Sequence, residues 1–576
     1  MTNATTYFLR PSTPSQKQYE ALRSFYLEKV SADSIAEQNG WTSAYFKKLR
    51  SEFLHEIRKG QNPYMPDKKF GAPKKSTHGD VVSEMIIDFR KQNYAITDIR
   101  VALQSKGYPR SLDAIDRLLK KEGFAPLPKR TRQERYATQA PVSIDAPASQ
   151  ALILENEMFT TEQGAGVLLF LPLLESLNII PAIQKAGFPK TAVLSDVSSV
   201  LSILALKLLG RARLSHDETW NFDRALGLFS MLNVLPKNTT LSSYSYRVSR
   251  KSNRLLLTEL SRIFKDDDDG VFNLDFKAIP HWGDASVLEK NWCGARSKAI
   301  KSILALIVQS PASGYLSYTD AEIKHRDQND AVLEFVDFWK EGHGQSPKML
   351  ILDSKMTTYN NLSRLNEDGI KFITLRRRGK RLTQLSDIDE SQWQKISLER
   401  AHRQMRTVKV VDHRIALRGY EGEVRQIILT DHGRARPAFL ITNDFDLDVK
   451  EILKRYSRRW LVEQEIAEQV DFFHLNQPSS SLVIKVDFDL TLSLLAHNLY
   501  RAFAKDLPGF EKCTSGTLYR NFVENGAVVT IRDKHIAVAM KKKTHLPTLF
   551  TLPCFKEKTT LPWMDATIQF SSTTVS

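Results

Sequence analysis

The 576-residue sequence contains very little cysteine. Its three cysteines, Cys293, Cys513 and Cys554, lie far apart and form no C-x-x-C pair. This spacing speaks against a cysteine-based zinc site and against a framework of disulfides. So few cysteines are typical of a protein that works in a reducing compartment.

Long hydrophobic runs are also missing. The two most apolar stretches, 164–177 and 200–210, contain proline or charged residues and are shorter than the roughly 20 residues that cross a bilayer. The first residues, MTNATTYFLRPSTPSQ, lack the apolar core of a signal peptide. We therefore expect buried core helices at the two stretches, no membrane partner and a cytoplasmic location.

Positive charge, by contrast, is in excess. The chain has 82 Lys and Arg against 66 Asp and Glu, a formal net charge of +16. Residues 1–135 alone hold 25 basic and 15 acidic residues, so ten of the sixteen excess charges lie in the first quarter of the chain. An excess of this size in a chain with 42 % hydrophobic residues favours an anionic partner, most often nucleic acid, although many basic proteins bind nothing anionic.

Two N-terminal segments have the outline of helix-turn-helix units. In 1–60, apolar residues at helical spacing stop at Asn39-Gly40 and resume after Thr42, a residue that caps helices well. In 77–135, a second helix follows Gly107 and carries an apolar stripe. Its polar side holds four basic residues that we expect to contact DNA: Arg110, Arg117, Lys120 and Lys121. Ordinary helical packing remains the alternative for both units.

The remaining chain predicts a multidomain protein in which α/β structure follows helices. Residues 151–265 show a helical pattern, and strand-like runs begin at about 270. Residues 380–445 hold short alternating runs, so we expect a mostly β insertion there. Helices are expected at 446–470, as one continuous element, and at 488–505. The predicted domains are 1–60, 77–135, 151–265, 270–505 and a C-terminal tail, 506–576.

Three acids in this second half are candidates for a metal site. Asp275 lies inside an apolar strand, and Asp353 lies at the carboxyl end of another, where α/β proteins collect ligands. A carboxylate in a strand core is costly to bury unless it is paired or bound to a cation. Glu463 would be the third acid, and Asp284, after a glycine, competes with Asp275 as the first. Converging carboxylates favour Mg²⁺, or Mn²⁺, over zinc.

The stretch RYSRRWLVEQEI (455–466) places Tyr456, Arg459 and Glu463 at a spacing that brings them to one face of a helix. A solvated face with an Arg–Glu pair would explain this pattern. The alternative is a metal-binding carboxylate beside two groups that contact phosphate. The two strand acids favour this second interpretation.

The order of these features resembles that of the bacterial insertion-sequence DDE transposases, in particular the group with a β insertion before the Glu. The resemblance covers about 270–505 and is carried by LDFKAIPHWGD, LILDSKMTTYNNL and Y-x-x-R-x-x-x-E. It implies an RNase H-like catalytic core and cut-and-paste transposition of DNA. In one departure, the family signature ends with a Lys seven residues after the Glu, where this chain has Val470. That difference puts one phosphate contact, and the activity of this copy, in doubt.

The sequence therefore predicts a DDE-type transposase that binds terminal inverted repeats through its N-terminal units. Asp275, Asp353 and Glu463 would be both the catalytic acids and the ligands of two Mg²⁺, while Tyr456 and Arg459 would contact DNA. We expect a homodimer on DNA, associated with the bacterial nucleoid. Two alternatives stay open: a helix-turn-helix regulator with an inactive core, and a metal-dependent nuclease that cuts without rejoining.

Overall fold

The computed structural model divides the chain into two compact units, Met1–Ser76 and Thr77–Ser576, and each is described here by itself. It describes residues 14–573 except for the following segments: 60–63, 65–80, 93, 125–126, 128–151, 153, 192–193, 212–218, 266–269, 282–287, 355, 377–387, 400–404, 434–435 and 478–482.

The described residues of the first unit form three helices, which are α2 (Pro14–Tyr26), α3 (Ala32–Asn39) and α4 (Ser43–Arg58). The Ser31 hydroxyl accepts from the N–H of Ser34 and begins α3, and the Thr42 hydroxyl begins α4 in the same way. Gly40 ends α3 in the left-handed conformation, φ 68°, which glycine adopts without a Cβ clash. The helices expected on either side of Asn39-Gly40 are therefore present.

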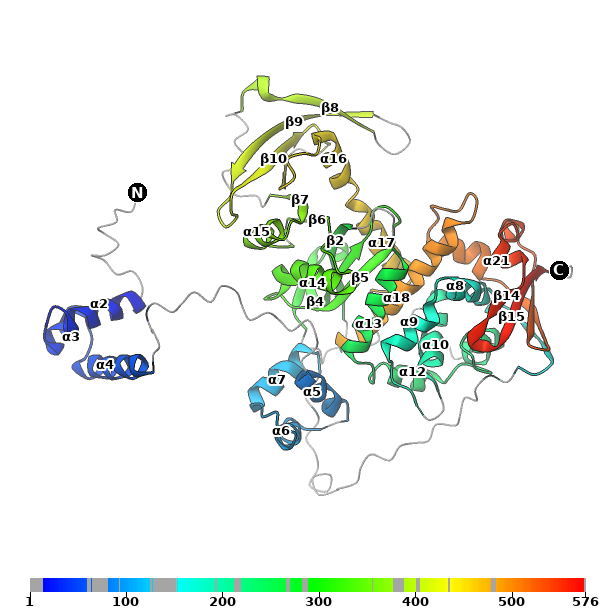
Figure 1. Ribbon diagram of the computed structural model, residues 1–576, viewed down its shortest axis with the longest axis horizontal. Coiled ribbons are helices and arrows are strands. Elements are labelled where there is room, and N and C mark those ends of the chain that lie inside the picture. The colour runs from blue at the N-terminus through cyan, green and yellow to red at the C-terminus, as the bar shows by residue number, and fades with distance from the viewer. Residues whose placement is uncertain are drawn as a thin grey trace. The chain divides into compact units, whose positions relative to one another are not determined.

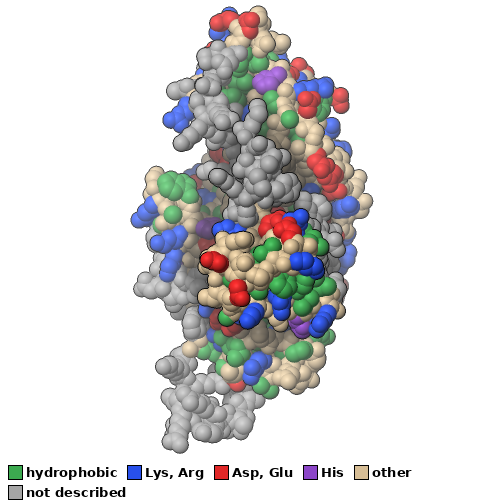
Figure 2. Space-filling view, turned by 90° about the vertical axis from the view of Figure 1, so that its left-hand side faces the viewer, with side chains coloured by type: hydrophobic (Ala, Val, Ile, Leu, Met, Phe, Trp, Pro, Cys, Tyr) green, Lys and Arg blue, Asp and Glu red, His purple; other side chains and the backbone are tan. Residues whose placement is uncertain are grey.

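A second group of three helices opens the larger unit: α5 (Val81–Lys91), α6 (Ile96–Ser105) and α7 (Leu112–Lys121). The apolar stripe predicted for α7 packs into the core of this group, with Ile115 and Leu119 fully buried. Arg117 and Lys120 lie on the exposed side of α7, and Lys120 pairs with Asp116 at 2.6 Å. Basic and acidic side chains are interspersed in this way over the face of the molecule in Figure 2.

The α5–α7 group is anchored to the rest of the larger unit by a buried ion pair. The Glu122 side chain, which is 0 % exposed, accepts two hydrogen bonds from the Arg250 guanidinium. The Glu122 carbonyl accepts from the N–H of Val483, and the Lys91 ammonium donates to the Val248 carbonyl. These contacts fix α7 against the helices that follow.

The segment from 154 to 265 is mostly helical. Its helices, which form much of the largest hydrophobic core, are η1 (Ala165–Phe170), α8 (Leu171–Ser176), α9 (Ile179–Ala186), α10 (Asp196–Leu208), η2 (Thr219–Phe222), α11 (Arg224–Phe229), α12 (Asn238–Tyr244) and α13 (Arg250–Ile263). Within the described residues no single helix has the length and apolar character to cross a membrane. The bent pair Ala165–Ser176 and Ile179–Ala186 passes by length and composition only.

The last part of the chain contributes most strands of a second sheet. Its strands are β12 (Ala527–Arg532), β13 (His535–Met540), β14 (Thr559–Leu561) and β15 (Ala566–Ser572). The distant strand β1 (Glu157–Thr161) pairs with β12 and completes the order β1-β12-β13-β15-β14. Between these strands lie α19 (Ser515–Leu518), η9 (Tyr519–Val523), α20 (Leu546–Leu549), α21 (Pro553–Lys556) and η10 (Pro562–Met564).

The centre of the larger unit is one mixed sheet of ten strands (Figure 1). Its strands are β2 (Val271–Pro280), β3 (Lys290–Cys293), β4 (Lys298–Gln309), β5 (Leu316–Ile323), β6 (Met349–Leu352), β7 (Lys371–Leu375), β8 (Gln394–Glu399), β9 (Met405–Ala416), β10 (Glu423–Thr430) and β11 (Ala438–Thr442). They follow the order β3-β4-β2-β6-β7-β11-β10-β9-β8, with β5 on β4. The strands of the predicted insertion, β8 to β11, thus extend the same sheet through the pairing of β11 with β7.

Helices on this sheet complete the core. They are α14 (Ala331–His343), α15 (Tyr359–Glu367), α16 (Val449–Ser457), α17 (Trp460–Asp471) and α18 (Val483–Lys505), with the short turns η3 (Gly294–Arg296), η4 (Gln328–Asp330) and η7 (Glu390–Gln392). The single helix predicted for 446–470 is wrong, because α16 ends at Ser457 and α17 begins at Trp460. At this break the Arg458 carbonyl accepts from the N–H of Leu461 at 3.0 Å, in a tighter turn than an α-helix, and also from the Asn273 side chain at 3.1 Å.

Candidate functional site

Asp275 and Asp353 come from neighbouring parallel strands. Asn273 on β2 is in register with Ile351 on β6. Asp275 lies two positions after Asn273, and Asp353 lies two positions after Ile351. Side chains two positions apart point to the same face of a sheet, and parallel neighbours lie about 5 Å apart. The sheet register therefore places both carboxylates side by side on one face, at the carboxyl end of β6.

Arg459 connects the first of these strand acids to Glu463. It caps the start of α17, and its guanidinium lies 3.4 Å from the Asp275 carboxylate and 2.6 Å from that of Glu463. Glu463 lies one turn further along α17, on a helix that packs on β2 and β4. Its side chain is 53 % exposed, whereas those of Asp275 and Arg459 are 21 % and 16 % exposed. A half-exposed acid and a mostly buried one thus share one cation.

Burial is the main influence on the ionisation of Asp275. It raises the pKa of this carboxyl to about 6, and the charges of Glu463 and Asp353 add to the rise, while Arg459 opposes it. The mutual effect of the three acids is the electrostatic sign that they converge. A second cation that binds next to this carboxylate would therefore stabilise its charged form.

Tyr456 belongs to the same cluster although it lies on the preceding helix. Its ring is under the Arg459 guanidinium, 5.8 Å from the ring centre. Burial raises the pKa of the Tyr456 phenol to about 12, so it remains a neutral hydrogen-bond donor. The Arg459 Nε–H is buried and meets no acceptor among the described residues. The cluster therefore offers two donors to an anion beside three carboxylates.

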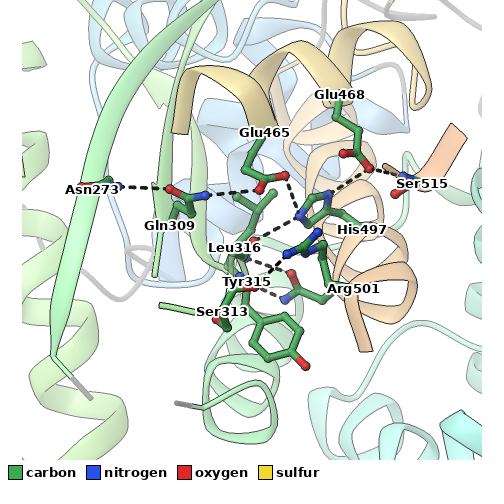
Figure 3. A network of polar contacts seen from close by, with 12 residues as sticks. Asn273, Gln309, Ser313, Tyr315, Leu316, Glu465, Glu468, His497, Arg501 and Ser515 are labelled. Atoms are coloured by element: carbon green, nitrogen blue, oxygen red, sulfur yellow. Dashed lines mark hydrogen bonds and ion pairs between the residues drawn. The ribbon is translucent and has the colours of Figure 1, made fainter. Parts of the chain in front are cut away.

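A second polar group lies on the other side of α17 and was not found from the sequence. His497 on α18 is 0 % exposed, and its Nε2 lies 3.3 Å from the Glu465 carboxylate. Its Nδ1 lies 3.7 Å from the carboxylate of Glu468, one turn along α17. Figure 3 shows the imidazole between the two glutamates. The sequence gives no signal for it, because the partners lie about thirty positions apart and look like ordinary helix residues.

This buried group is linked to the strand that carries Asp275. The Gln309 amide donates to Glu465 at 3.4 Å and accepts from the Asn273 side chain at 3.2 Å (Figure 3). At the other end, the N–H of Ser515 donates to the Glu468 carboxylate at 2.7 Å. The chain of contacts runs from β2 through β4 and α17 to α19, so it fixes the helix that presents Glu463.

The other predicted site residues have different surroundings. Asp284, the rival of Asp275, lies outside the described residues. Val470, at the position of the family's Lys, packs against the main hydrophobic core. The four basic residues predicted to contact DNA belong to α7 and its N-terminal flank, and α7 packs on α5 and α6: Arg110, Arg117, Lys120 and Lys121.

Comparison with known proteins identifies the sheet region. Residues 286–499 match the family described as the transposase DDE domain. This chain contains a DDE transposase domain. The matched region includes Asp353, Tyr456, Arg459 and Glu463, and begins after Asp275. No curated protein matches the chain.

Proposed function

We propose that this protein is the transposase of a bacterial insertion sequence, and that Asp275, Asp353 and Glu463 are its catalytic acids. The observation that carries the proposal is the convergence of these acids: Arg459 joins Asp275 of β2 to Glu463 of α17, and the sheet register places Asp353, after β6, beside Asp275. Their arrangement on a mixed sheet with helices packed on it supports an RNase H-like core. Two basic three-helix groups earlier in the chain support DNA binding by helix-turn-helix units.

The acid cluster suits two magnesium ions. Its donors are carboxylate oxygens, which are hard ligands, and the desolvation of Asp275 favours a nearby divalent cation. Asp275, Asp353 and Glu463 would hold the ions. When bound, such a pair activates water and stabilises the departing 3′-oxygen in an in-line attack on phosphorus.

The residues around the acids position the DNA. Arg459 shares its charge between Asp275 and Glu463, and its guanidinium would contact a phosphate oxygen next to them. Tyr456, held neutral, donates a second hydrogen bond to the same strand. The phosphodiester is thus gripped by donors that lie next to the acids, which is the geometry that strand cleavage and transfer need. Two copies of the protein would hold the two transposon ends together.

The test uses a labelled duplex that carries the inverted repeats flanking the gene. We expect the wild-type protein to bind the repeat, to cleave it only with Mg²⁺ or Mn²⁺, and to join the freed 3′ end to a second DNA. Asp353→Asn should lower cleavage by at least about 1,000-fold and change repeat binding by less than about three-fold. Asp337→Asn, at an exposed acid on α14, is the matched control and should cleave normally.

Each other outcome rejects the proposal in a defined way. Cleavage without joined product would make the protein a nuclease, and binding without cleavage would make it a regulator. Normal cleavage by Asp353→Asn would remove the acid cluster from the mechanism.

A further inference from the structure

A cavity of about 920 Å³ lies along α17, on the side where Glu465 and Glu468 lie rather than on the side of Asp275. Its wall begins at Leu461 and Gln464, next to Glu463, and continues to Asp471 at the end of the helix. The opposite wall comes from three distant parts of the chain and contributes four cations: Arg211, Arg501, Lys512 and Arg520. A cavity of this size, with several charged groups in a partly apolar wall, calls for a ligand.

The acids in the cavity wall are mostly neutralised from behind. Glu465 and Glu468 are 14 % and 9 % exposed and contact the buried His497 (Figure 3). Although burial lowers it, contacts with these two glutamates raise the pKa of His497 above its ordinary value, which favours its charged form. Arg501 also lies near Glu465 and donates to the Ser313 carbonyl.

The charge left facing the cavity is positive. Once Glu465 and Glu468 are matched by His497 and Arg501, the exposed charges of the lining are those of Lys512 and Arg520 against Asp471. Lys512 and Arg520 are exposed, and neither forms an ion pair within 4 Å among the described residues. The cavity therefore suits an anion with several separated charges better than an apolar or cationic molecule.

The position of the cavity identifies the anion. Glu463 and Asp471 are eight residues apart on one helix, a distance of about 12 Å. Successive phosphates of one strand are spaced about 3.4 Å along a duplex axis, so the cavity spans phosphates up to about four nucleotides from the acids. We propose that this cavity binds the phosphodiester backbone of the DNA strand that adjoins the cut, with Lys512 and Arg520 as its phosphate contacts.

This inference rests on the proposed function, and it also bears on Val470. Val470 is half-buried and packs against the core, so the phosphate contact that the family's Lys would make at this position is missing from this chain. Cations from the opposite wall of the cavity take over the phosphate contact in this chain.

The experiment scans single phosphates. The full-length protein binds the terminal-repeat duplex without Mg²⁺, so that the DNA stays intact, and each phosphate within ten nucleotides of the cut is replaced in turn by an uncharged methylphosphonate. The double variant Lys512→Ala/Arg520→Ala is compared with wild type and with Lys541→Ala/Lys542→Ala, which removes two exposed cations elsewhere in the C-terminal region.

Wild type and control should lose affinity about five- to ten-fold at one or two phosphates within four nucleotides of the cut. The cavity variant should bind the unmodified duplex about ten-fold more weakly, show no further loss at those phosphates, and have a salt dependence smaller by about two phosphate contacts. Asp471→Asn removes the remaining acid of the cavity and should tighten binding about two-fold. Because misfolding could only weaken binding, this gain separates the effect of charge from an effect on folding.

A cavity variant that keeps the wild-type pattern of phosphate sensitivity overturns this inference and leaves the proposed function intact. Absence of repeat-specific binding by the wild-type protein overturns both.

Discussion

The two sides of α17 repeat one arrangement in different surroundings. On one side Arg459 lies between Asp275 and Glu463, and on the other His497 lies between Glu465 and Glu468. The first group is half open to solvent at Glu463, whereas the second is buried and is tied to Gln309 and Ser515. A cation between two carboxylates holds a helix in place when it is buried and enclosed, and stays available for ligands when it is open.

The comparison predicts its largest effect on cleavage. Glu463→Gln should reduce Mg²⁺-dependent cleavage at least about 1,000-fold, because it removes a metal ligand. Its free energy of unfolding should change by less than about 1 kcal/mol, since the Glu463 side chain is half exposed. Glu468→Gln should show the opposite pattern, with cleavage within about three-fold and reduced stability. Equal loss of cleavage in both variants would erase the distinction between the two sides.

The next effect concerns stability. His497→Leu removes the partner of two buried glutamates, and breaking a buried pair in this way typically costs about 3–5 kcal/mol. Denaturant unfolding should show this loss. His497→Gln, which can still donate to one glutamate, should recover part of it. If His497→Leu unfolded like the wild type, the network of Figure 3 could not be what fixes α17.

Arg459 should have an intermediate effect on cleavage. Arg459→Gln removes the charge that Asp275 and Glu463 share and the donor offered to phosphate, so we expect cleavage to fall about 100-fold. Binding of the terminal repeat should weaken less than ten-fold, because other contacts hold the duplex. Arg455→Gln, on α16, is the control, since Arg455 pairs with Glu451 away from the acids. A stronger effect from the control would contradict the role given to Arg459.

The sequence predicted one side of α17 much better than the other. Asp275, Asp353 and Glu463 could be found because each lies at a recognisable place: inside a strand, after a strand, and in a spaced motif. The sheet register and Arg459 then bring them together. His497 could not be predicted as the partner of Glu465 and Glu468, because nothing in an apolar helix reveals which distant residues will face it.

The fold was predicted in part for a similar reason. Periodicity indicated the strands that carry or precede Asp275 and Asp353, β2 and β6, since local pattern decides such elements. The break at Arg458 was missed because the helical pattern of the sequence continues through it, and one of its contacts comes from the Asn273 side chain, 185 positions away. The pairing of β1 with β12 was also missed, since a short strand gives no sign of its partner.

The smallest expected effect lies away from both sides of the helix, at Asp487 near the start of α18. Burial, with Asp320 nearby, raises the pKa of Asp487 to about 7. The folded state therefore holds a proton that the unfolded chain releases near pH 4, and stability should fall as pH rises from about 4 to 7. Asp487→Asn should remove this component and be more stable above pH 7 by on the order of 1 kcal/mol or more.

The amide can be accommodated because Asn253, which donates to Asp487 at 2.6 Å, has a buried Oδ1 without a partner among the described residues. Turning the Asn253 amide lets this oxygen accept from the new side chain. Thermal unfolding of both proteins from pH 4 to pH 9 gives the comparison. Parallel pH profiles would show that Asp487 ionises normally.

The most direct test of the central claim is metal rescue at Asp353. Asp353→Cys replaces a hard oxygen ligand with a soft sulfur, which Mg²⁺ binds poorly and Mn²⁺ tolerates better. We predict that this variant cleaves the terminal repeat at no more than about one thousandth of the wild-type rate with Mg²⁺. Replacing Mg²⁺ with Mn²⁺ should raise the rate of the variant at least about ten-fold. Glu468→Cys, on the buried side, should show no such preference. Full activity of Asp353→Cys with Mg²⁺, or the same inactivity with both ions, would contradict metal ligation by the three acids.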